Sequence, residues 1–106
     1  MGSRVLVVED YPDLRSAIVA ALDRANYDCV GAATPDDAIR KLKSGKYSAI
    51  VLDPVADIGS DPVMIFLREQ QPEQVRNVVV LGDEGLSKPF DTADLVARLP
   101  INTARG

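Results

Sequence analysis

The sequence is poor in several features that mark particular classes of protein. It holds a single cysteine, Cys29, which excludes an internal disulfide and is typical of a reducing compartment. Its apolar runs are far too short to cross a bilayer, and its first residues lack the apolar stretch and small-residue cleavage site of a secretory signal. We therefore expect a soluble, cytoplasmic protein without membrane insertion.

Positive charge is also scarce. The chain has 12 Lys and Arg against 16 Asp and Glu, which gives a formal net charge of -4. Binding to nucleic acid draws on clustered Lys and Arg that displace counterions from phosphates, so we expect no direct nucleic-acid partner. Acidic side chains can instead hold a hard cation.

The length of 106 residues is enough for one compact core but not for two. No internal repeat, low-complexity tract or linker interrupts the chain. We therefore expect residues 1–106 to form one domain that stands alone, without an appended output module.

Short apolar runs alternate with amphipathic segments, which is the pattern of a parallel sheet covered by helices on both faces. The runs expected to form strands are 5–8, 29–33, 49–52 and 78–81, with a short fifth strand at 86–87. The helices are expected over 14–25, from the N-cap Thr34 to Gly45, from the N-cap Asp61 to before Pro72, and from Asp91 to before Pro100. The fold class is thus a doubly wound, five-stranded parallel α/β sheet of the flavodoxin-like kind, with strand order 2-1-3-4-5.

Acidic side chains follow two of these strands. Glu9 and Asp10 come directly after the first strand, and Asp53 comes directly after the third. In this architecture those two strands are neighbours at the point where the order reverses, so their carboxyl ends lie side by side. Three carboxylates brought together repel one another, and a divalent cation compensates them. Oxygen ligands alone suit Mg²⁺, especially at a site shared with a phosphate.

Three segments resemble the signature segments of response regulator receiver domains. They are Val5-Leu6-Val7-Val8-Glu9-Asp10, Asp53 after Ile50-Val51-Leu52, and Lys88-Pro89-Phe90. Their order and spacing match the family from residue 4 to about residue 53. The combination is fairly specific, whereas an acidic pair or a Lys-Pro-Phe by itself is weak.

The resemblance implies roles for individual residues. Asp53 would accept the phosphoryl group, and Glu9, Asp10, Asp53 and the backbone carbonyl of Val55 would hold Mg²⁺. Lys88 would pair with the phosphoryl oxygens. The donor would be a sensor histidine kinase or a phosphotransfer protein, and the domain would be a signalling acceptor in a phosphorelay rather than an enzyme.

The sequence departs from the family pattern after the fourth strand. Gly82 stands where receivers carry Thr or Ser, and Gly85 stands where they carry an aromatic switch residue. Only residues 83–87 separate Gly82 from Lys88, too few for the usual fourth helix, so we expect that helix to be missing or replaced by a short loop.

Two other functions are consistent with parts of this pattern. The glycines and the lost helix favour a degenerate receiver that binds proteins without phosphorylation. An aspartyl phosphatase of the haloacid dehalogenase type usually has a second Asp two positions after its nucleophile, and Val55 occupies that place here. The phosphatase reading is therefore the weakest of the three.

Residues outside the signature segments are expected to be structural. Tyr11 and Tyr47 are expected to be packing residues, and Cys29 is expected to be a small buried hydrophobe.

Overall fold

The computed structural model describes residues 4–54, 57–81 and 99. In these residues the strands are β1 Arg4–Val8, β2 Asp28–Ala32, β3 Ala49–Leu52 and β4 Val78–Val80. The helices are α1 Pro12–Arg24, α2 Pro35–Ser44, α3 Pro62–Gln70 and a 3₁₀ helix, η1, over Pro72–Asn77. No helix in this part of the chain is long and apolar enough to cross a membrane.

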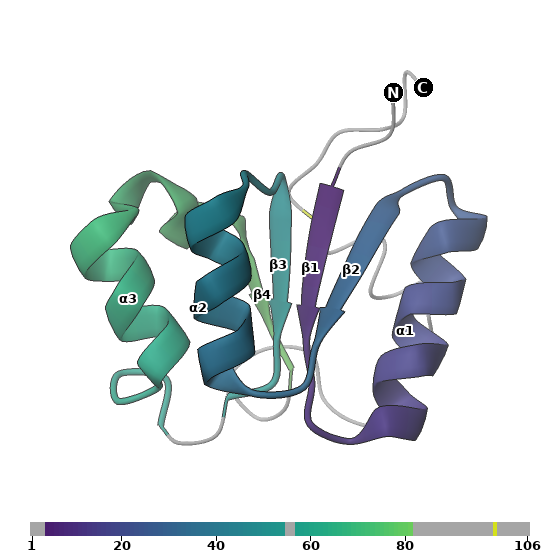
Figure 1. Ribbon diagram of the computed structural model, residues 1–106, viewed down its shortest axis with the longest axis horizontal. Coiled ribbons are helices and arrows are strands. Elements are labelled where there is room, and N and C mark those ends of the chain that lie inside the picture. The colour runs from purple at the N-terminus through teal and green to yellow at the C-terminus, as the bar shows by residue number, and fades with distance from the viewer. Residues whose placement is uncertain (1–3, 55–56, 82–98, 100–106) are drawn as a thin grey trace.

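The strands form one parallel sheet in the order β2-β1-β3-β4 (Figure 1). This confirms the expected doubly wound α/β class and the first four places of the order 2-1-3-4-5. The expected fifth strand, the last helix and the segment that replaces the fourth helix lie outside the described residues.

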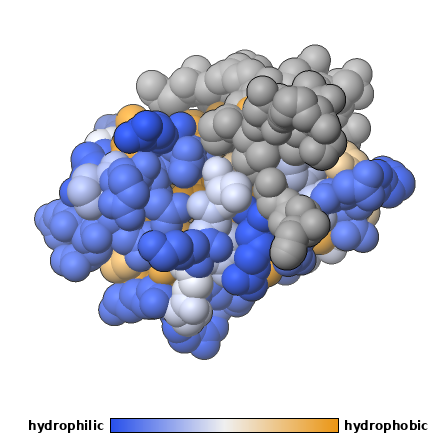
Figure 2. Space-filling model, turned by 90° about the horizontal axis from the view of Figure 1, so that it is seen from above, coloured by the Kyte–Doolittle hydropathy of each residue, from blue (hydrophilic) through white to orange (hydrophobic). Residues whose placement is uncertain are grey.

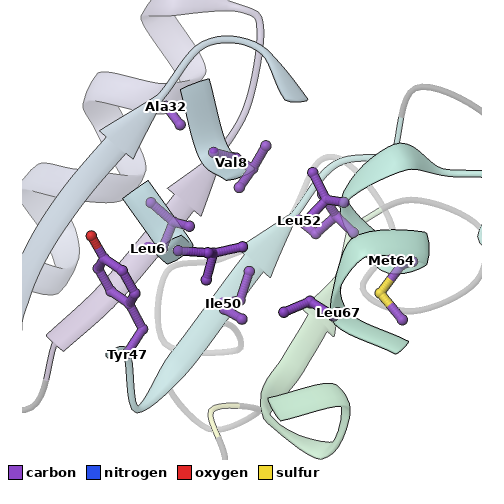
Figure 3. Packing of buried hydrophobic residues seen from close by; sticks show 11 residues of the cluster. Leu6, Val8, Ala32, Tyr47, Ile50, Leu52, Met64 and Leu67 are labelled. Carbon is purple, nitrogen blue, oxygen red and sulfur yellow. The ribbon is translucent and has the colours of Figure 1, made fainter. Parts of the chain in front are cut away.

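Both faces of the sheet are covered, and the alternation of side chains along each strand assigns them. Val5, Val7 and Val51 pack with Ile18 and Leu22 of α1 on one face. The alternate strand residues Leu6, Val8, Ile50 and Leu52 face the other side. There they form a cluster with Met64 and Leu67 of α3, and Figure 3 shows the side chains of this cluster. A strand buried on both faces reads as a continuous apolar run, which is why β1 and β3 could be located from the sequence.

Two helices begin where their caps predict. The Thr34 Oγ1 accepts a hydrogen bond of 3.1 Å from the backbone N–H of Asp37. The Asp61 Oδ1 accepts hydrogen bonds of 2.9 Å from Val63 N–H and 3.3 Å from Met64 N–H. Each cap is followed by a proline at the first helical position, where the missing N–H would have had no helical partner.

Gly45 ends α2 as expected, but for a different reason from the usual left-handed glycine cap. Its backbone is extended, with φ of -163°, a conformation open to any residue. A Cβ at this position would lie 3.1 Å from Nη1 of Arg4. The Arg4 guanidinium itself lies over the ring of Tyr47, 5.0 Å from its centroid. The glycine therefore leaves room for this stacked arginine.

The expectations for the smaller structural residues had mixed outcomes. Tyr47 is buried, as predicted, and Cys29 packs against the α1 face of the core but is only half-buried. The prediction for Tyr11 is wrong, because its side chain is 59% exposed. Tyr11 occupies the turn that leads into α1, ahead of the first apolar position of that helix, and so has no core to pack against.

Candidate functional site

Three carboxylates meet at the edge where β1 and β3 end, at the lower side of the sheet in Figure 1. Val8 and Leu52, the last residues of these strands, are register partners in the parallel pair. The next residues along each strand therefore leave the sheet side by side. Carboxylate oxygens of Glu9, Asp10 and Asp53 all lie within 4.8 Å of one another. The structure thus brings together the three acids that the sequence predicted for a metal site.

Hydrogen bonds from described residues fix both the backbone and the side chain of Glu9. Its backbone N–H donates a 3.0 Å hydrogen bond to the carbonyl of Ala32 in β2. Its carbonyl accepts a 2.8 Å hydrogen bond from Nη1 of Arg15, and its Oε2 accepts one of 3.2 Å from the backbone N–H of Tyr11. The residue is only 1% exposed. A carboxylate held this way presents its oxygens in a set direction, as a metal ligand requires.

Asp53 and Asp10 sit progressively nearer to solvent. The backbone N–H of Asp53 donates a 3.0 Å hydrogen bond to the carbonyl of Val8, which ties the residue to the end of β1. Asp53 is half-buried and Asp10 is exposed. The cluster is therefore closed on the Glu9 side and open on the Asp10 side, so an incoming group would approach from there.

The donor set fits a hard divalent cation. All three ligands are carboxylates, and three negative charges within this distance repel one another in the folded state only. Oxygen ligands are the preferred environment of Mg²⁺, which keeps part of its water shell and so does not need a complete protein cage. The half-open arrangement of the cluster is compatible with that requirement.

Other residues of the predicted site lie outside the described residues. They are Val55 and Lys88, whose predicted roles stay predictions; Gly82 and Gly85, where the sequence departs from the family pattern, also lie outside the described residues. Arg15 is not among the residues predicted from the sequence, although its guanidinium donates a hydrogen bond to the Glu9 carbonyl. An arginine that bonds a backbone carbonyl on another element leaves no pattern in the sequence.

A hollow formed by the described residues lies elsewhere. It has a volume of about 670 Å³ and is bordered by the end of α2, Tyr47 and residues of η1, at the amino-terminal edge of the sheet. Figure 2 looks onto that edge and shows mainly hydrophilic side chains over the described surface. No residue of the carboxylate cluster lines it, so it is not the predicted site.

Similar sequences come from response regulators. The transcriptional regulatory protein DltR of Streptococcus agalactiae serotype III is 29% identical over 115 residues, covering 94% of this chain and 51% of that protein. The phosphate regulon regulator PhoB of Escherichia coli is 28% identical over 116 residues, covering 93% and 51%. The chain thus spans about half the length of the curated relatives it matches. No protein-family model matches the chain.

Similar structures are receiver domains. The receiver domain of a sensor histidine kinase from Pseudomonas aeruginosa PAO1, solved with a magnesium ion in its active-site cleft, has a TM-score of 0.76, 27% identity and coverage of 92% and 93%. The chemotaxis response regulator CheY4 of Vibrio cholerae has a TM-score of 0.77, 21% identity and coverage of 92% and 95%.

The response regulator TrrA of Thermotoga maritima, in complex with Mg²⁺ and BeF, has a TM-score of 0.59, 25% identity and coverage of 74% and 66%. The same regulator has been solved in complex with the histidine kinase ThkA, where the TM-score is 0.66, the identity 22% and the coverage 86% and 78%.

The sheet order and the acids at the ends of β1 and β3 define a receiver-type α/β domain. Together with the similar proteins and structures, they show that the chain has the fold of a response regulator receiver domain. The expectation that the domain stands alone stays a prediction.

Proposed function

We propose that this receiver domain accepts a phosphoryl group on Asp53 in a reaction that requires Mg²⁺. The observation that carries the proposal is the convergence of Glu9, Asp10 and Asp53 within 4.8 Å at the carboxyl ends of neighbouring strands. Glu9, Asp10, Asp53 and the Val55 carbonyl hold the metal ion in this proposal. Lys88 contacts the phosphoryl oxygens, as the resemblance to receivers implies.

Asp53 is the acceptor in this proposal, and its burial is intermediate between that of Glu9 and that of Asp10. Glu9 is buried and its Oε2 already accepts the Tyr11 N–H, whereas Asp53 is half-buried beside the open side of the cluster. A carboxylate oxygen of Asp53 attacks phosphorus while the bond from phosphorus to the donor histidine nitrogen breaks and the imidazole leaves with the electron pair. The product is an acyl phosphate on Asp53. Bound Mg²⁺ supplies positive charge that offsets the negative charge of the transferred group.

In this proposal the donor is a sensor histidine kinase or a phosphotransfer protein, and the domain works in the cytoplasm. Support comes from the similar regulator TrrA, whose structure in complex with a histidine kinase is known. We further propose that the domain is an acceptor in signal transduction and turns over no separate substrate. In this proposal the response is carried out by the molecule that the phosphorylated domain contacts.

Intact-mass measurement after incubation with acetyl phosphate tests the proposal. The wild type is expected to gain one hydroxylamine-labile phosphoryl group with Mg²⁺ and none with EDTA. Asp53→Asn should gain none, because an amide cannot form an acyl phosphate. Asp57→Asn removes an exposed acid outside the cluster and is the matched control, expected to behave as wild type. Persistent labelling of Asp53→Asn would reject the assignment.

A degenerate, phosphorylation-independent binding module is the second candidate. The sequence features that favour it are Gly82 and Gly85, which replace both side chains of the usual receiver switch. This alternative predicts that a partner binds equally well to wild type and Asp53→Asn, with or without acetyl phosphate. Loss of partner binding in Asp53→Asn would count against it.

A further inference from the structure

We propose that Arg15 is a positioning residue for the carboxylate cluster, and that Gly31 makes space for it. The inference rests on the proposed function, since it concerns how this chain orients the ligands of the metal site. Arg15 touches no reacting group in this account. It acts through the backbone of Glu9.

The contact that supports the inference joins α1 to the residue that directly follows β1. Nη1 of Arg15 donates a 2.8 Å hydrogen bond to the Glu9 carbonyl. The backbone N–H of Arg15 donates to the Tyr11 carbonyl at 2.9 Å, so the base of the side chain is fixed in the first turn of α1. The Arg15 side chain therefore links the first turn of α1 back to Glu9. This link restrains the turn between them, which contains Asp10.

The Glu9 carbonyl matters because it belongs to the peptide group that joins Glu9 to Asp10. That peptide group is planar, so fixing its carbonyl restricts the backbone rotations on both sides of it. Those rotations set the directions in which the two carboxylates leave the chain. Among the described residues, Glu9 is also held by the bond from its own N–H to Ala32 and by the bond from Tyr11 N–H to its Oε2, and both of these bonds come from backbone N–H groups. Among these three bonds, only the arginine is a side chain that mutation can remove.

Gly31 explains why an arginine can take this path. A Cβ on Gly31 would lie 3.3 Å from Cδ, 3.5 Å from Cγ and 3.7 Å from Nε of Arg15. The arginine stem therefore lies directly over the bare backbone of β2. Gly31 pairs with Val7 of β1. The next residue of β2, Ala32, accepts the hydrogen bond from the Glu9 N–H through its carbonyl. The lack of a side chain at Gly31 thus leaves the space that the Arg15 side chain occupies.

Charge and position act in opposite directions at this residue, and this makes the proposal testable. A guanidinium beside a cation site repels Mg²⁺, so removing the charge alone should strengthen metal binding. Loss of positioning should weaken it. Within the part of the chain that the structure describes, Arg15 makes no ion pair with a carboxylate, so a substitution there frees no acid.

Calorimetric titration of the full chain with Mg²⁺ distinguishes the two effects. Arg15→Met keeps the stem but not the donor, and is expected to raise the Mg²⁺ dissociation constant roughly tenfold, the usual effect of losing a group that orients a metal ligand. Arg15→Lys restores a donor and should recover part of the affinity. Gly31→Ala forces the stem to shift and should weaken binding less than Arg15→Met does.

Two control variants match these changes. Arg24→Met removes an exposed arginine from the last turn of the same helix, and Gly59→Ala adds a methyl group where nothing lies within 4 Å. Both are expected to bind Mg²⁺ as the wild type does. Thermal unfolding adds a second readout, because a merely structural arginine would lower the midpoint of the apo protein but leave the stabilisation by Mg²⁺ unchanged.

Equal or tighter Mg²⁺ binding by folded Arg15→Met would overturn the inference while leaving the proposed function intact. If Arg15→Met does not fold, Arg15→Lys and Gly31→Ala decide by the same measurement, and wild-type affinity in both would also overturn it. Absence of Mg²⁺ binding by the wild type would overturn the proposed function itself, and the inference with it.

Discussion

At the scale of single residues, Asp10 can be replaced to test the charge repulsion within the carboxylate cluster. It is the exposed member of three acids whose oxygens lie within 4.8 Å. Two like charges at this separation repel by roughly 1 kcal/mol in a water-like environment. This repulsion exists only in the folded state and is relieved when a divalent cation binds.

We therefore expect Asp10→Asn to have a higher free energy of unfolding than the wild type in EDTA, by roughly 1 kcal/mol or less. In millimolar-range Mg²⁺ the order should reverse, because the wild type gains stability from binding and the variant loses most of that gain. Urea unfolding under both conditions measures the two differences. Equal response of both proteins to Mg²⁺ would contradict the metal site.

Cys29 gives a pH-dependent expectation at the same scale. Burial, followed by the charges of Asp23 and Asp28, raises the pKa of the thiol to about 11. At pH 8, a smaller fraction of Cys29 than of free cysteine is therefore present as thiolate. A more basic thiolate is also more nucleophilic, which offsets part of this difference. The net expectation is that iodoacetamide alkylates Cys29 about tenfold more slowly than free cysteine. The rate should rise with a midpoint near pH 11.

The same pKa fixes the direction of its effect on stability. Between the lower pKa of the unfolded thiol and about 11, the unfolded chain releases a proton that the folded protein keeps. The free energy of unfolding should therefore fall as pH rises through that window, and Cys29→Ser should remove this part of the slope. An alkylation midpoint near that of free cysteine would contradict the buried environment.

At the scale of elements, Asp61 is the cap on which α3 depends most. It is fully buried, and its Oδ1 accepts from two backbone N–H groups that would otherwise lack helical partners. Asp61→Ala should lower the free energy of unfolding by about 1–2 kcal/mol. Asp61→Asn keeps an acceptor oxygen and should cost less than half of that. Denaturant unfolding of the two variants measures this, and equal losses would show that the charge, rather than the acceptor, is what α3 requires.

The elements that the sequence predicted share strong local signals. The strand at Ala49–Leu52 was placed with both ends correct because a short apolar run between polar residues has few alternatives. The helices at Pro35 and Pro62 were located by a capping side chain followed by proline. The 3₁₀ helix over Pro72–Asn77 was missed, because a short segment of this kind carries no repeated apolar spacing.

The site was predictable to the extent that topology determines it. Once the strands are parallel and β1 lies beside β3, acids directly after each strand must meet, so Glu9, Asp10 and Asp53 followed from the sequence. The contact from Arg15 to the Glu9 carbonyl depends instead on the path of one long side chain over Gly31. The spacing of apolar residues along a helix predicts which residues face the core. It does not predict which polar side chain makes a hydrogen bond at the end of a strand.

At the scale of the whole molecule, a core on both faces of the sheet supports the edge that carries the three carboxylates. The strands that end in acids are buried on both faces, so the positions of Glu9 and Asp53 are set by the most constrained part of the fold. A rigid edge of this kind holds ligands close together without a metal, at a cost in repulsion. The central claim is that this edge binds Mg²⁺ and a phosphoryl group together, with Asp53 as the acceptor.

An NMR titration with Mg²⁺ and then with beryllofluoride, a phosphoryl analogue, tests that claim most directly. Mg²⁺ should shift the amide signals of Glu9, Asp10, Asp53 and their neighbours. Beryllofluoride should then bind only when Mg²⁺ is present and only when residue 53 is aspartate. Beryllofluoride shifts of equal size in Asp53→Asn, or in wild type without Mg²⁺, would contradict the account.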